Sequence, residues 1–576
     1  MKVLRKWWWL LLIILVAGVV RFYRLEEVPA GLYYDEVDLA YQARSLLETG
    51  RDYRGTFSPF YAWSMHDLKT PLPIYLSIPA AMIFSPGVLQ ARVTTALAGI
   101  AVVVLSVLLV LKWTKDKKAA FLVGTVMALN PWLIQFSRIA FEAMFALMMY
   151  LGFLLAFFSW LKSKNVKTFY LSVVLLSLGV YSYRIMSFYI PLTFLMVGLV
   201  YWRDIIKVGV KHLVIGAAIS GAIILPFLYY TAVETPDQTR FEQLSIFSDP
   251  LAPIYVIRGR EVDTGDYLQE TVGNRPVWYS YLFHNKGVEY LSSLKNNYLK
   301  SISTAFLFAT GDSNLRQGMG KTGALLWIDI IGLAAGLFWL TNNIKRKENQ
   351  LLGLWLLSSP LPADLTVDGA SHASRLIMMA GPLLILVGLG WWQIAKMISK
   401  QKWGGFLKLV LAGAYLLVFL NVAHKYFVHF PLEAARWHGY GYQQAMLKIK
   451  EIEKDYDKIM LTNSNDPAML YYLFWAQIPP KEVQEYGVDF GPETIKNMEL
   501  DKVKMMSWSK VTEGKQMPHE MGEVLEDGAL YLITQQDAKG DIRPNKGRLP
   551  SGVKIIESVP YPDNSEVAYF LITKGD

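Results

Sequence analysis

The chain has 576 residues, of which 53% are hydrophobic and 14% aromatic, and its formal net charge is +9. This composition excludes an ordinary soluble domain and favours a polytopic membrane protein. The absence of cysteine excludes disulfides, thiol nucleophiles and cysteine-based metal sites. The positive charge lies in short clusters between apolar stretches, which indicates membrane topology and argues against a nucleic-acid partner.

The first apolar stretch, WWWLLLIILVAGVV at 7–20, follows three basic residues and resembles a signal peptide. No small-residue cleavage site comes after it, so we expect a retained first helix. With it, eleven spans are predicted, the other ten lying near 88–111, 119–136, 140–161, 168–183, 186–202, 212–230, 323–342, 350–366, 375–396 and 405–422.

The stretch PLPIYLSIPAAMIF at 71–84 is too short to span a bilayer, and we expect an interfacial or re-entrant segment there. Eleven spans place five lysine-rich loops on the side of the N-terminus, as the positive-inside rule requires. Counting 71–84 as a span would move all five to the other side. The sequence therefore predicts a cytoplasmic N-terminus in a plasma-membrane protein.

Two domains follow from this topology. Residues 1–430 form the membrane domain, with large external segments at 23–87 and 231–322. Residues 431–576 are predicted to form an extracytoplasmic soluble α/β domain, with a helix at 441–456 and strands at 457–463, 528–534, 553–559 and 566–573. The predicted fold class is thus a polytopic α-helical membrane protein with about 11 transmembrane helices, interfacial helices in the first external loop, and this C-terminal domain.

An acidic motif, YYDE, opens a helical pattern in the first external segment. Asp35 and Asp38 have the spacing of an N-cap and an N3 residue, an apolar stripe follows, and Gly50 is placed to end the helix. On that interpretation the helix lies flat on the membrane and the carboxylates only begin it. Glu36 adds more charge than a cap needs, however, and Lys69 lies further along the same segment. A carboxylate and a lysine there suit an acceptor hydroxyl and a phosphate.

Further charged residues lie at the predicted outer ends of the spans. Glu142 falls in the first turn of the fourth span, where a carboxylate is costly and becomes a functional candidate. The alternative is an ion pair with Arg138, four residues earlier. Arg184 and Arg375 occupy two other outer ends, where arginine opposes the usual charge bias. Arg138, Arg184 and Arg375 could converge with Lys69 on a phosphate-bearing lipid head group, although each alone is better explained as a lipid-surface residue.

The order of these features resembles the GT-C membrane glycosyltransferases, most closely the protein O-mannosyltransferase and aminoarabinose-transferase branch. The resemblance rests on a first span, the external YYDE, the segment KTPLP, and the stretches NPWLIQFSRIAFEAMF, GDSNLRQG and SHASR, and covers about residues 1–430. The tail does not resemble the β-trefoil insert of eukaryotic protein mannosyltransferases, which puts a protein acceptor in doubt.

The resemblance implies that Asp35 is catalytic, with Glu36 as its partner and Glu142 as the second acidic position. Lys69 and Arg184 match the phosphate-binding residues, and Arg375 matches only a general pattern. The same motifs add Arg138, Tyr34 and His66 as candidate substrate-binding residues.

The expected function is transfer of a monosaccharide from a polyprenyl-phosphate donor to an acceptor hydroxyl outside the cytoplasm, with inversion implied by the family. The acceptor could be a glycan, a lipid or a protein. Mg²⁺ or Mn²⁺ would suit Asp35 and Glu142 as ligands, but two carboxylates do not define a metal site. A transporter, or a non-catalytic membrane assembly factor on the same scaffold, are the alternatives; a transporter should show two homologous halves with broken helices, which the sequence lacks.

Overall fold

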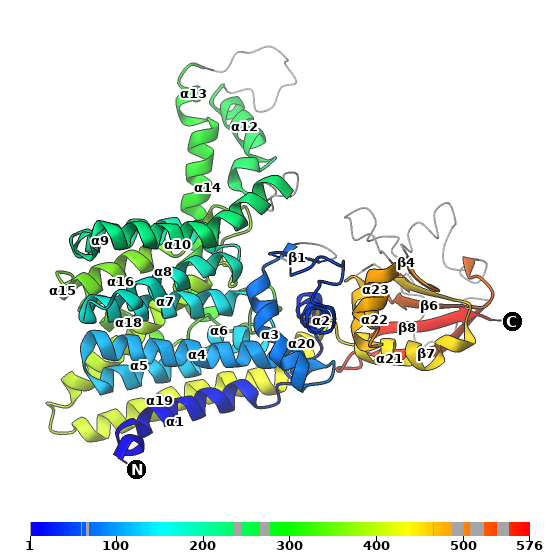
Figure 1. Cartoon of the computed structure of the whole chain (residues 1–576), viewed down its shortest axis with the longest axis horizontal. Coiled ribbons are helices and arrows are strands. Elements are labelled where there is room, and N and C mark those ends of the chain that lie inside the picture. Colours follow the sequence, from blue (N-terminus) through cyan, green and yellow to red (C-terminus); the bar gives the residue numbers. More distant parts are fainter. Residues whose placement is uncertain are drawn as a thin grey trace.

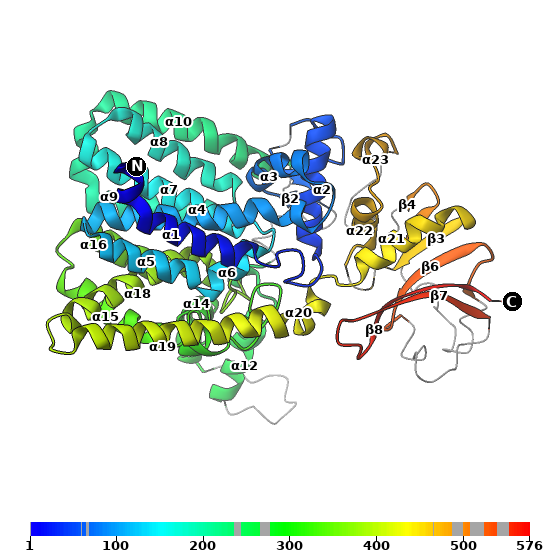
Figure 2. The same ribbon diagram turned by 90° about the horizontal axis from the view of Figure 1, so that it is seen from below.

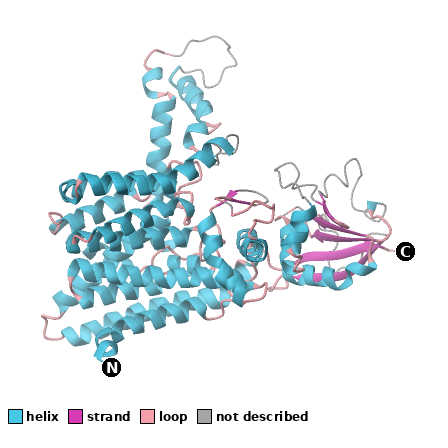
Figure 3. Cartoon of the chain, viewed as in Figure 1, coloured by secondary structure: helices cyan, strands magenta, loops and turns pink. Residues whose placement is uncertain are grey.

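The computed structural model describes residues 2–58, 60–64, 68–234, 244–264, 277–462, 464, 466–486, 499–506, 524–537 and 552–575, with side chains from Trp7 onward. A helical bundle forms one part of the molecule, and an α/β domain lies beyond one end of it (Figure 1). Two further helices, α12 and α14, project from the side of the bundle (Figure 1). Apart from one small hairpin, the strands are confined to the α/β domain (Figure 3).

Each of the eleven predicted spans coincides with helical structure in the bundle. The helices are α1 (Lys2–Phe22), α4 (Val88–Thr114), α5 (Lys117–Leu129), α6 (Pro131–Arg138), α7 (Ala143–Ser163), α8 (Val166–Ser177), α9 (Met186–Ile205), α10 (Val210–Tyr229), α15 (Asp329–Asn342), α16 (Lys347–Ser358), α18 (Ile377–Ile398) and α19 (Gly404–His424).

Among the described residues, six helices are long and apolar enough to cross a membrane, or seven if the bent pair α5 and α6 counts as one span. The chain is therefore a multi-pass membrane protein. The count of eleven is not confirmed, because α1, α8 and α15 are apolar but shorter and α16 has only 12 residues.

The predicted span 119–136 is broken. Helices α5 and α6 meet at an angle of 57°, and Asn130 ends the first and caps the second by accepting a 2.9 Å hydrogen bond from the Leu133 amide. Pro131 occupies the first turn of α6. The dipeptide Asn130-Pro131 explains the break, because proline disfavours helical geometry in the residue before it and suits the start of a helix.

Helices α15 and α18 pack closely through small residues. A Cβ atom on Gly390 would lie 1.8 Å from the Gly332 carbonyl oxygen, and one on Gly336 would lie 2.1 Å from the Leu386 carbonyl oxygen. Glycine at such points lets two helix backbones approach in a membrane, where packing replaces the hydrophobic effect as the force between helices.

The segment between α1 and α4 folds over the end of the bundle nearest the α/β domain (Figure 1). It contains α2 (Tyr34–Thr49), the strands β1 (Ala62–Trp63) and β2 (Leu68–Lys69), and α3 (Pro71–Ile83). The predicted apolar stripe of α2 packs on α3, since Leu39, Ala43 and Leu46 form one buried cluster with Ile74. The interfacial placement of both helices in the sequence prediction agrees with this arrangement.

The start of α2 lies two residues before the predicted one. Its N-cap is Tyr33, and Asp35 lies inside the first turn instead of capping it. Glu36, at N3, accepts a 3.3 Å hydrogen bond from the Tyr33 amide, so it takes the role predicted for Asp38. Gly50 ends the helix with φ +68°, as the sequence predicted.

The described residues of the second long connection, between α10 and α15, include the α-helices α12 (Ala252–Thr264), α13 (Ser280–Phe283) and α14 (Lys286–Ser301). A short helix, α17 (Leu361–Asp364), follows α16, so the span predicted to end at 366 ends at Ser358.

The tail begins at α20 (Phe430–Glu433) and forms a six-stranded sheet in the order β4-β5-β3-β6-β8-β7. Its elements are α21 (Tyr442–Ile452), β3 (Lys458–Thr462), α22 (Ala468–Trp475), α23 (Pro480–Tyr486), β4 (Glu499–Leu500), β5 (Val503–Met506), β6 (Ala529–Thr534), β7 (Val553–Pro560) and β8 (Val567–Lys574). β5, β3 and β6 are parallel, and the remaining neighbours pair antiparallel. The four predicted strands and the predicted helix are present.

The tail and α2 share one hydrophobic core. Val37 and Tyr41 of α2 pack in the same buried cluster as Met469 and Leu473 of α22. The Tyr41 hydroxyl donates a 2.9 Å hydrogen bond to the Ile478 carbonyl. Figure 2 shows α2 between the bundle on one side and α22 and α23 on the other. Helix α2 is thus held from both sides.

Candidate functional site

Asp35 and Lys69 form an ion pair at this end of the bundle. Asp35 projects from the first turn of α2, and Lys69 ends β2 directly before α3. Both side chains are largely buried, at 15% and 13% exposure. Burial by itself would lower the pKa of Lys69, but the carboxylate of Asp35 outweighs it, and the pKa is raised. The lysine therefore carries its charge throughout the physiological range.

Glu142 completes this group from a third element. It lies directly before α7, and its carboxylate accepts a 3.1 Å hydrogen bond from the backbone amide of Thr70, the residue after Lys69. Burial raises the pKa of Glu142, and the nearby charge of Lys69 opposes that rise. The sequence predicted that Asp35, Lys69 and Glu142 would lie close together, and the fold places them so.

Arg184 approaches the same group from the turn before α9. Its guanidinium donates a 2.7 Å hydrogen bond to the Leu68 carbonyl, next to Lys69. Its neighbour Tyr183 has a pKa raised by burial, with Arg375 acting against the rise and Glu142 and Asp35 adding to it. The Tyr183 hydroxyl, which the sequence analysis did not select, donates a 3.3 Å hydrogen bond to the hydroxyl of Ser374, the residue before Arg375.

Arg375 is itself paired. It forms an ion pair with Asp368 and donates a 2.7 Å hydrogen bond to the Thr366 hydroxyl. Its charge is therefore compensated within its own loop.

Glu36 faces away from this group, and the structure gives it a different role from the catalytic one expected. Its carboxylate is fully buried and lies 2.8 Å from Arg92 of α4, and it also accepts a 2.9 Å hydrogen bond from the Ala140 amide. Burial alone would raise the pKa of Glu36, but Arg92 and His438 lower it to about 2. All these contacts fix α2 to the bundle, so Glu36 is a positioning residue here.

Arg138 also has a structural place in the fold. It is fully buried and donates hydrogen bonds to the carbonyls of Arg21 at 2.8 Å and Val28 at 2.8 Å. It thereby satisfies backbone carbonyls at the end of α1, which have no helical partner. Among the described ion pairs, Arg138 forms none with Glu142, which was the alternative interpretation of these two residues. His66 lies outside the described residues.

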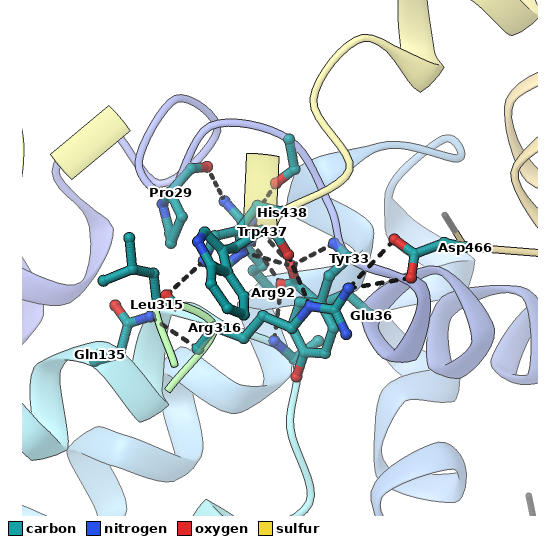
Figure 4. Close-up of polar contacts among 12 residues, drawn as sticks. Pro29, Tyr33, Glu36, Arg92, Gln135, Leu315, Arg316, Trp437, His438 and Asp466 are labelled. Carbon is teal, nitrogen blue, oxygen red and sulfur yellow. Dashed lines mark hydrogen bonds and ion pairs between the residues drawn. The ribbon is translucent and has the colours of Figure 1, made fainter. Parts of the chain in front are cut away.

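A further cation, Arg316, reaches this region from the loop before α15. Its Nε donates a 2.8 Å hydrogen bond to the Trp437 carbonyl, and Nη2 lies 3.1 Å from the Asp466 carboxylate in the tail. The guanidinium lies 5.7 Å from the ring centre of Tyr33 and 5.5 Å from that of Tyr34. Figure 4 shows Arg316 between Tyr33 and Asp466. The stretch GDSNLRQG contains Arg316 but does not indicate its partner, because Asp466 lies 150 residues away in the chain.

The carboxylates do not fit a divalent ion well. Lys69 pairs with Asp35, and its charge also acts on the carboxylate of Glu142. The ammonium group of Lys69 therefore already neutralises the two carboxylates that a metal ion would bind. Across the part of the chain that is described, no group of three or more His, Asp or Glu side chains is arranged to hold a metal. No step of the chemistry below is routed through an ion.

No protein-family profile and no curated protein sequence matches the chain. Among solved structures, ArnT from Cupriavidus metallidurans bound to undecaprenyl phosphate is similar over 98% of this chain and 98% of that one, with a TM-score of 0.55 and 13% identity. The Archaeoglobus fulgidus oligosaccharyltransferase in its apo form is similar over 83% of this chain and 64% of that one, with a TM-score of 0.46 and 16% identity, too distant to support an argument.

The similarity to ArnT includes the tail domain as well as the bundle, since it extends over nearly the whole chain. At this identity it establishes the fold and leaves the activity to be argued from the site. The chain is a multi-pass membrane protein with the fold of ArnT from Cupriavidus metallidurans, which agrees with the fold that the sequence resemblance implied.

Proposed function

We propose that this protein is a membrane glycosyltransferase that moves a monosaccharide from a polyprenyl-phosphate donor to an acceptor hydroxyl. The observation that carries the proposal is the Asp35–Lys69 ion pair, flanked by Glu142 and Arg184 at one end of the bundle. It is supported by the fold of ArnT, whose solved structure is bound to undecaprenyl phosphate. A site with one base and a cluster of cations suits a reaction whose leaving group is a phosphate.

In the proposed reaction, the oxygen of the acceptor hydroxyl attacks the anomeric carbon of the donor sugar. The bond from that carbon to the phosphate oxygen breaks, and its electron pair leaves with the polyprenyl phosphate. Asp35 takes the hydroxyl proton as general base. A single displacement of this kind inverts the configuration at the anomeric carbon.

The ion pair links the proton transfer to Asp35 with the departure of the phosphate. When Asp35 accepts a proton it loses its charge, and the charge of Lys69 is no longer balanced by it. At the same moment the leaving phosphate gains negative charge. Lys69, with Arg184 beside it, is then available to stabilise that charge, in a site partly closed to water where such interactions are strong. Glu142, held by the Thr70 amide, keeps the strand end that carries Lys69 in place.

The proposal also includes the orientation of the protein in the membrane. The N-terminus lies in the cytoplasm, and the tail and the site lie on the outer side of the plasma membrane. Activated nucleotide sugars are not supplied there, which favours a lipid-carried donor. The polyprenyl chain lies along the membrane-facing surface of the helices, and the acceptor is a hydroxyl of a glycan, a lipid or a protein.

The test uses the full-length protein purified and reconstituted in liposomes that contain a panel of undecaprenyl-phosphoryl monosaccharides. Hydrolysis of the donor, in which water takes the place of the acceptor hydroxyl, is measured as release of undecaprenyl phosphate for the wild type and for Asp35→Asn. General-base catalysis contributes about 10²- to 10⁴-fold in rate, so a loss of that size is expected.

Glu48→Gln is the matched control, because Glu48 is a carboxylate on the same helix that pairs only with Arg44 at the surface. If Asp35→Asn kept the wild-type rate, the assignment of Asp35 as the general base would be wrong. A wild-type protein that consumes no member of the panel would instead support a non-catalytic assembly factor.

A further inference from the structure

The tail domain reaches the site through a single carboxylate, Asp466. This residue follows β3, at the carboxyl end of a parallel strand, where α/β sheets commonly place ligand-binding groups. Two tyrosines hold it: the Tyr442 hydroxyl donates to its carbonyl at 3.2 Å, and the Tyr471 hydroxyl donates to its carboxylate at 3.5 Å. Asp466 is thus fixed by its own domain before it meets Arg316.

Arg316 and Lys69 flank the same aromatic ring. The Lys69 ammonium lies 5.5 Å from the ring centre of Tyr34, and the Arg316 guanidinium lies 5.5 Å from it as well. Tyr34 directly precedes Asp35, and the charge of Asp35 acts on Arg316. Both cations therefore lie beside the ring of the residue that precedes the proposed base.

The two ion pairs differ in what they can bind. The Asp35–Lys69 pair changes its charge when Asp35 takes a proton, and so responds to a phosphate that gains charge. Arg316 is paired with Asp466, which has no part in that proton transfer, so the second pair stays neutral overall. A pair without net charge attracts a phosphate only weakly. It can, however, donate hydrogen bonds to hydroxyl oxygens through the guanidinium and accept hydrogen bonds from hydroxyl groups through the carboxylate.

In the Arg316–Asp466 pair, Arg316 is the more exposed member. The two side chains are 28% and 13% exposed. Nε and Nη2 of Arg316 are used in hydrogen bonds to Trp437 and Asp466, and none of the hydrogen bonds found within the described ranges uses Nη1. Tyr34 adds a half-buried aromatic ring beside it.

We propose that Arg316 and Asp466 bind the hydroxyl groups of the donor's sugar, so that the tail domain supplies one of the residues that select the sugar. This rests on the proposed function, since it assumes a polyprenyl-phosphoryl sugar at Lys69. The sugar ring lies between the two ion pairs, with its phosphate on Lys69 and its distal hydroxyls on Arg316 and Asp466. The tail is then part of the substrate site and not only a support for α2.

The experiment compares the affinity of two kinds of lipid for the full-length protein in nanodiscs. One is undecaprenyl phosphate, which has no sugar, and the other is the undecaprenyl-phosphoryl monosaccharide of the panel that binds the wild type most tightly. Asp466→Asn, Arg316→Gln and Arg316→Lys are measured beside Lys69→Gln. Arg436→Gln is the matched control, because Arg436 forms exposed ion pairs with Asp563 and Glu566 within the same domain.

The expected result is that Asp466→Asn and Arg316→Gln each weaken binding of the sugar-bearing lipid about tenfold and leave the sugar-free lipid unchanged, as loss of hydrogen bonds to one part of a ligand requires. The double variant should lose no more than either single one, because the residues act as a pair. Lys69→Gln should weaken both lipids, and Arg436→Gln neither.

Other outcomes overturn the proposal in distinguishable ways. If Asp466→Asn and Arg316→Gln lower both affinities equally, or only the temperature of unfolding, the pair is a structural clamp. If no sugar-bearing lipid binds more tightly than the sugar-free one, there is no sugar site, although the phosphate site stands. If neither lipid binds the wild type, the proposed function itself fails. Arg316→Lys keeps the ion pair and loses the forked geometry, so it still tests recognition if Asp466→Asn fails to fold.

Discussion

Lys69 and Asp35 form a largely buried ion pair between the end of β2 and the first turn of α2. Breaking such a pair from one side leaves a charge without its partner, which typically costs about 3–5 kcal/mol when burial is complete and less when it is partial. The ion pair that we propose for catalysis should therefore also contribute measurably to the stability of the fold.

Lys69→Met should therefore be destabilised by about 2 kcal/mol, because the carboxylate of Asp35 loses its partner. The double variant Lys69→Met/Asp35→Asn should recover much of that loss, since the unpaired charge is gone. Thermal unfolding of the purified protein measures both. Lys448→Met, which removes a surface ion pair with Glu451, is the control and should change the midpoint little. A double variant as unstable as Lys69→Met would mean that the lysine acts through packing.

Glu36 should contribute to stability in a manner that depends on pH. Its pKa is lowered from 4.5 to about 2 in the folded protein by Arg92 and His438, against the effect of burial. A lowered carboxylate pKa stabilises the fold above the unfolded value, and this contribution is lost as pH falls from about 4.5 toward 2. Glu36→Gln should accordingly lower the unfolding temperature at pH 6 to 8, and the difference from wild type should narrow at pH 3. An equal difference at both pH values would contradict this account.

Asp38 should show the opposite dependence. It is fully buried in α2, and its carboxylate accepts a 2.8 Å hydrogen bond from the Tyr53 hydroxyl. Burial raises its pKa from 3.8 to about 7, although Lys69 opposes the rise. A raised carboxyl pKa gives stability that is complete below about 3.8 and is lost as pH rises through about 7. Asp38→Asn should thus stabilise the protein at pH 8 by about 2 kcal/mol and have little effect at pH 4. Unfolding midpoints across that range measure it, and a variant destabilised at pH 8 would refute it.

The proposed orientation can be tested directly because the chain has no cysteine. Glu451→Cys lies on the exposed surface of α21 in the tail, and Lys345→Cys lies in the exposed connection between α15 and α16. A membrane-impermeant maleimide applied to intact cells should label the first and reach the second only after permeabilisation. The reverse pattern would place the Asp35 site on the cytoplasmic side, where the argument for a lipid-carried donor does not hold.

Much of the scaffold is determined by local sequence. Apolar stretches separated by lysine clusters predict the positions of the bundle helices, because burial in lipid requires each backbone group to be bonded within its own helix. The stripe of α2 and the glycine after it predict its length, and alternating apolar residues predict four of the tail strands. The dipeptide Asn130-Pro131 also indicates the break between α5 and α6, although the predicted span 119–136 did not include a break.

Tertiary structure decided which charges belong to the site. Asp35 and Glu36 are adjacent in sequence, yet successive residues of a helix point about 100° apart. One therefore faces Lys69 and the other faces Arg92. Arg138 was an equally good candidate as Arg184 by sequence, and only the arrival of the end of α1 made it a carbonyl ligand. Arg316 and Asp466 meet across 150 residues, a distance over which composition and spacing carry no information. The sequence by itself determined which segments form the apolar helices of the bundle, because that depends on each segment's own polarity. The partners of the charged side chains depend instead on how those segments pack.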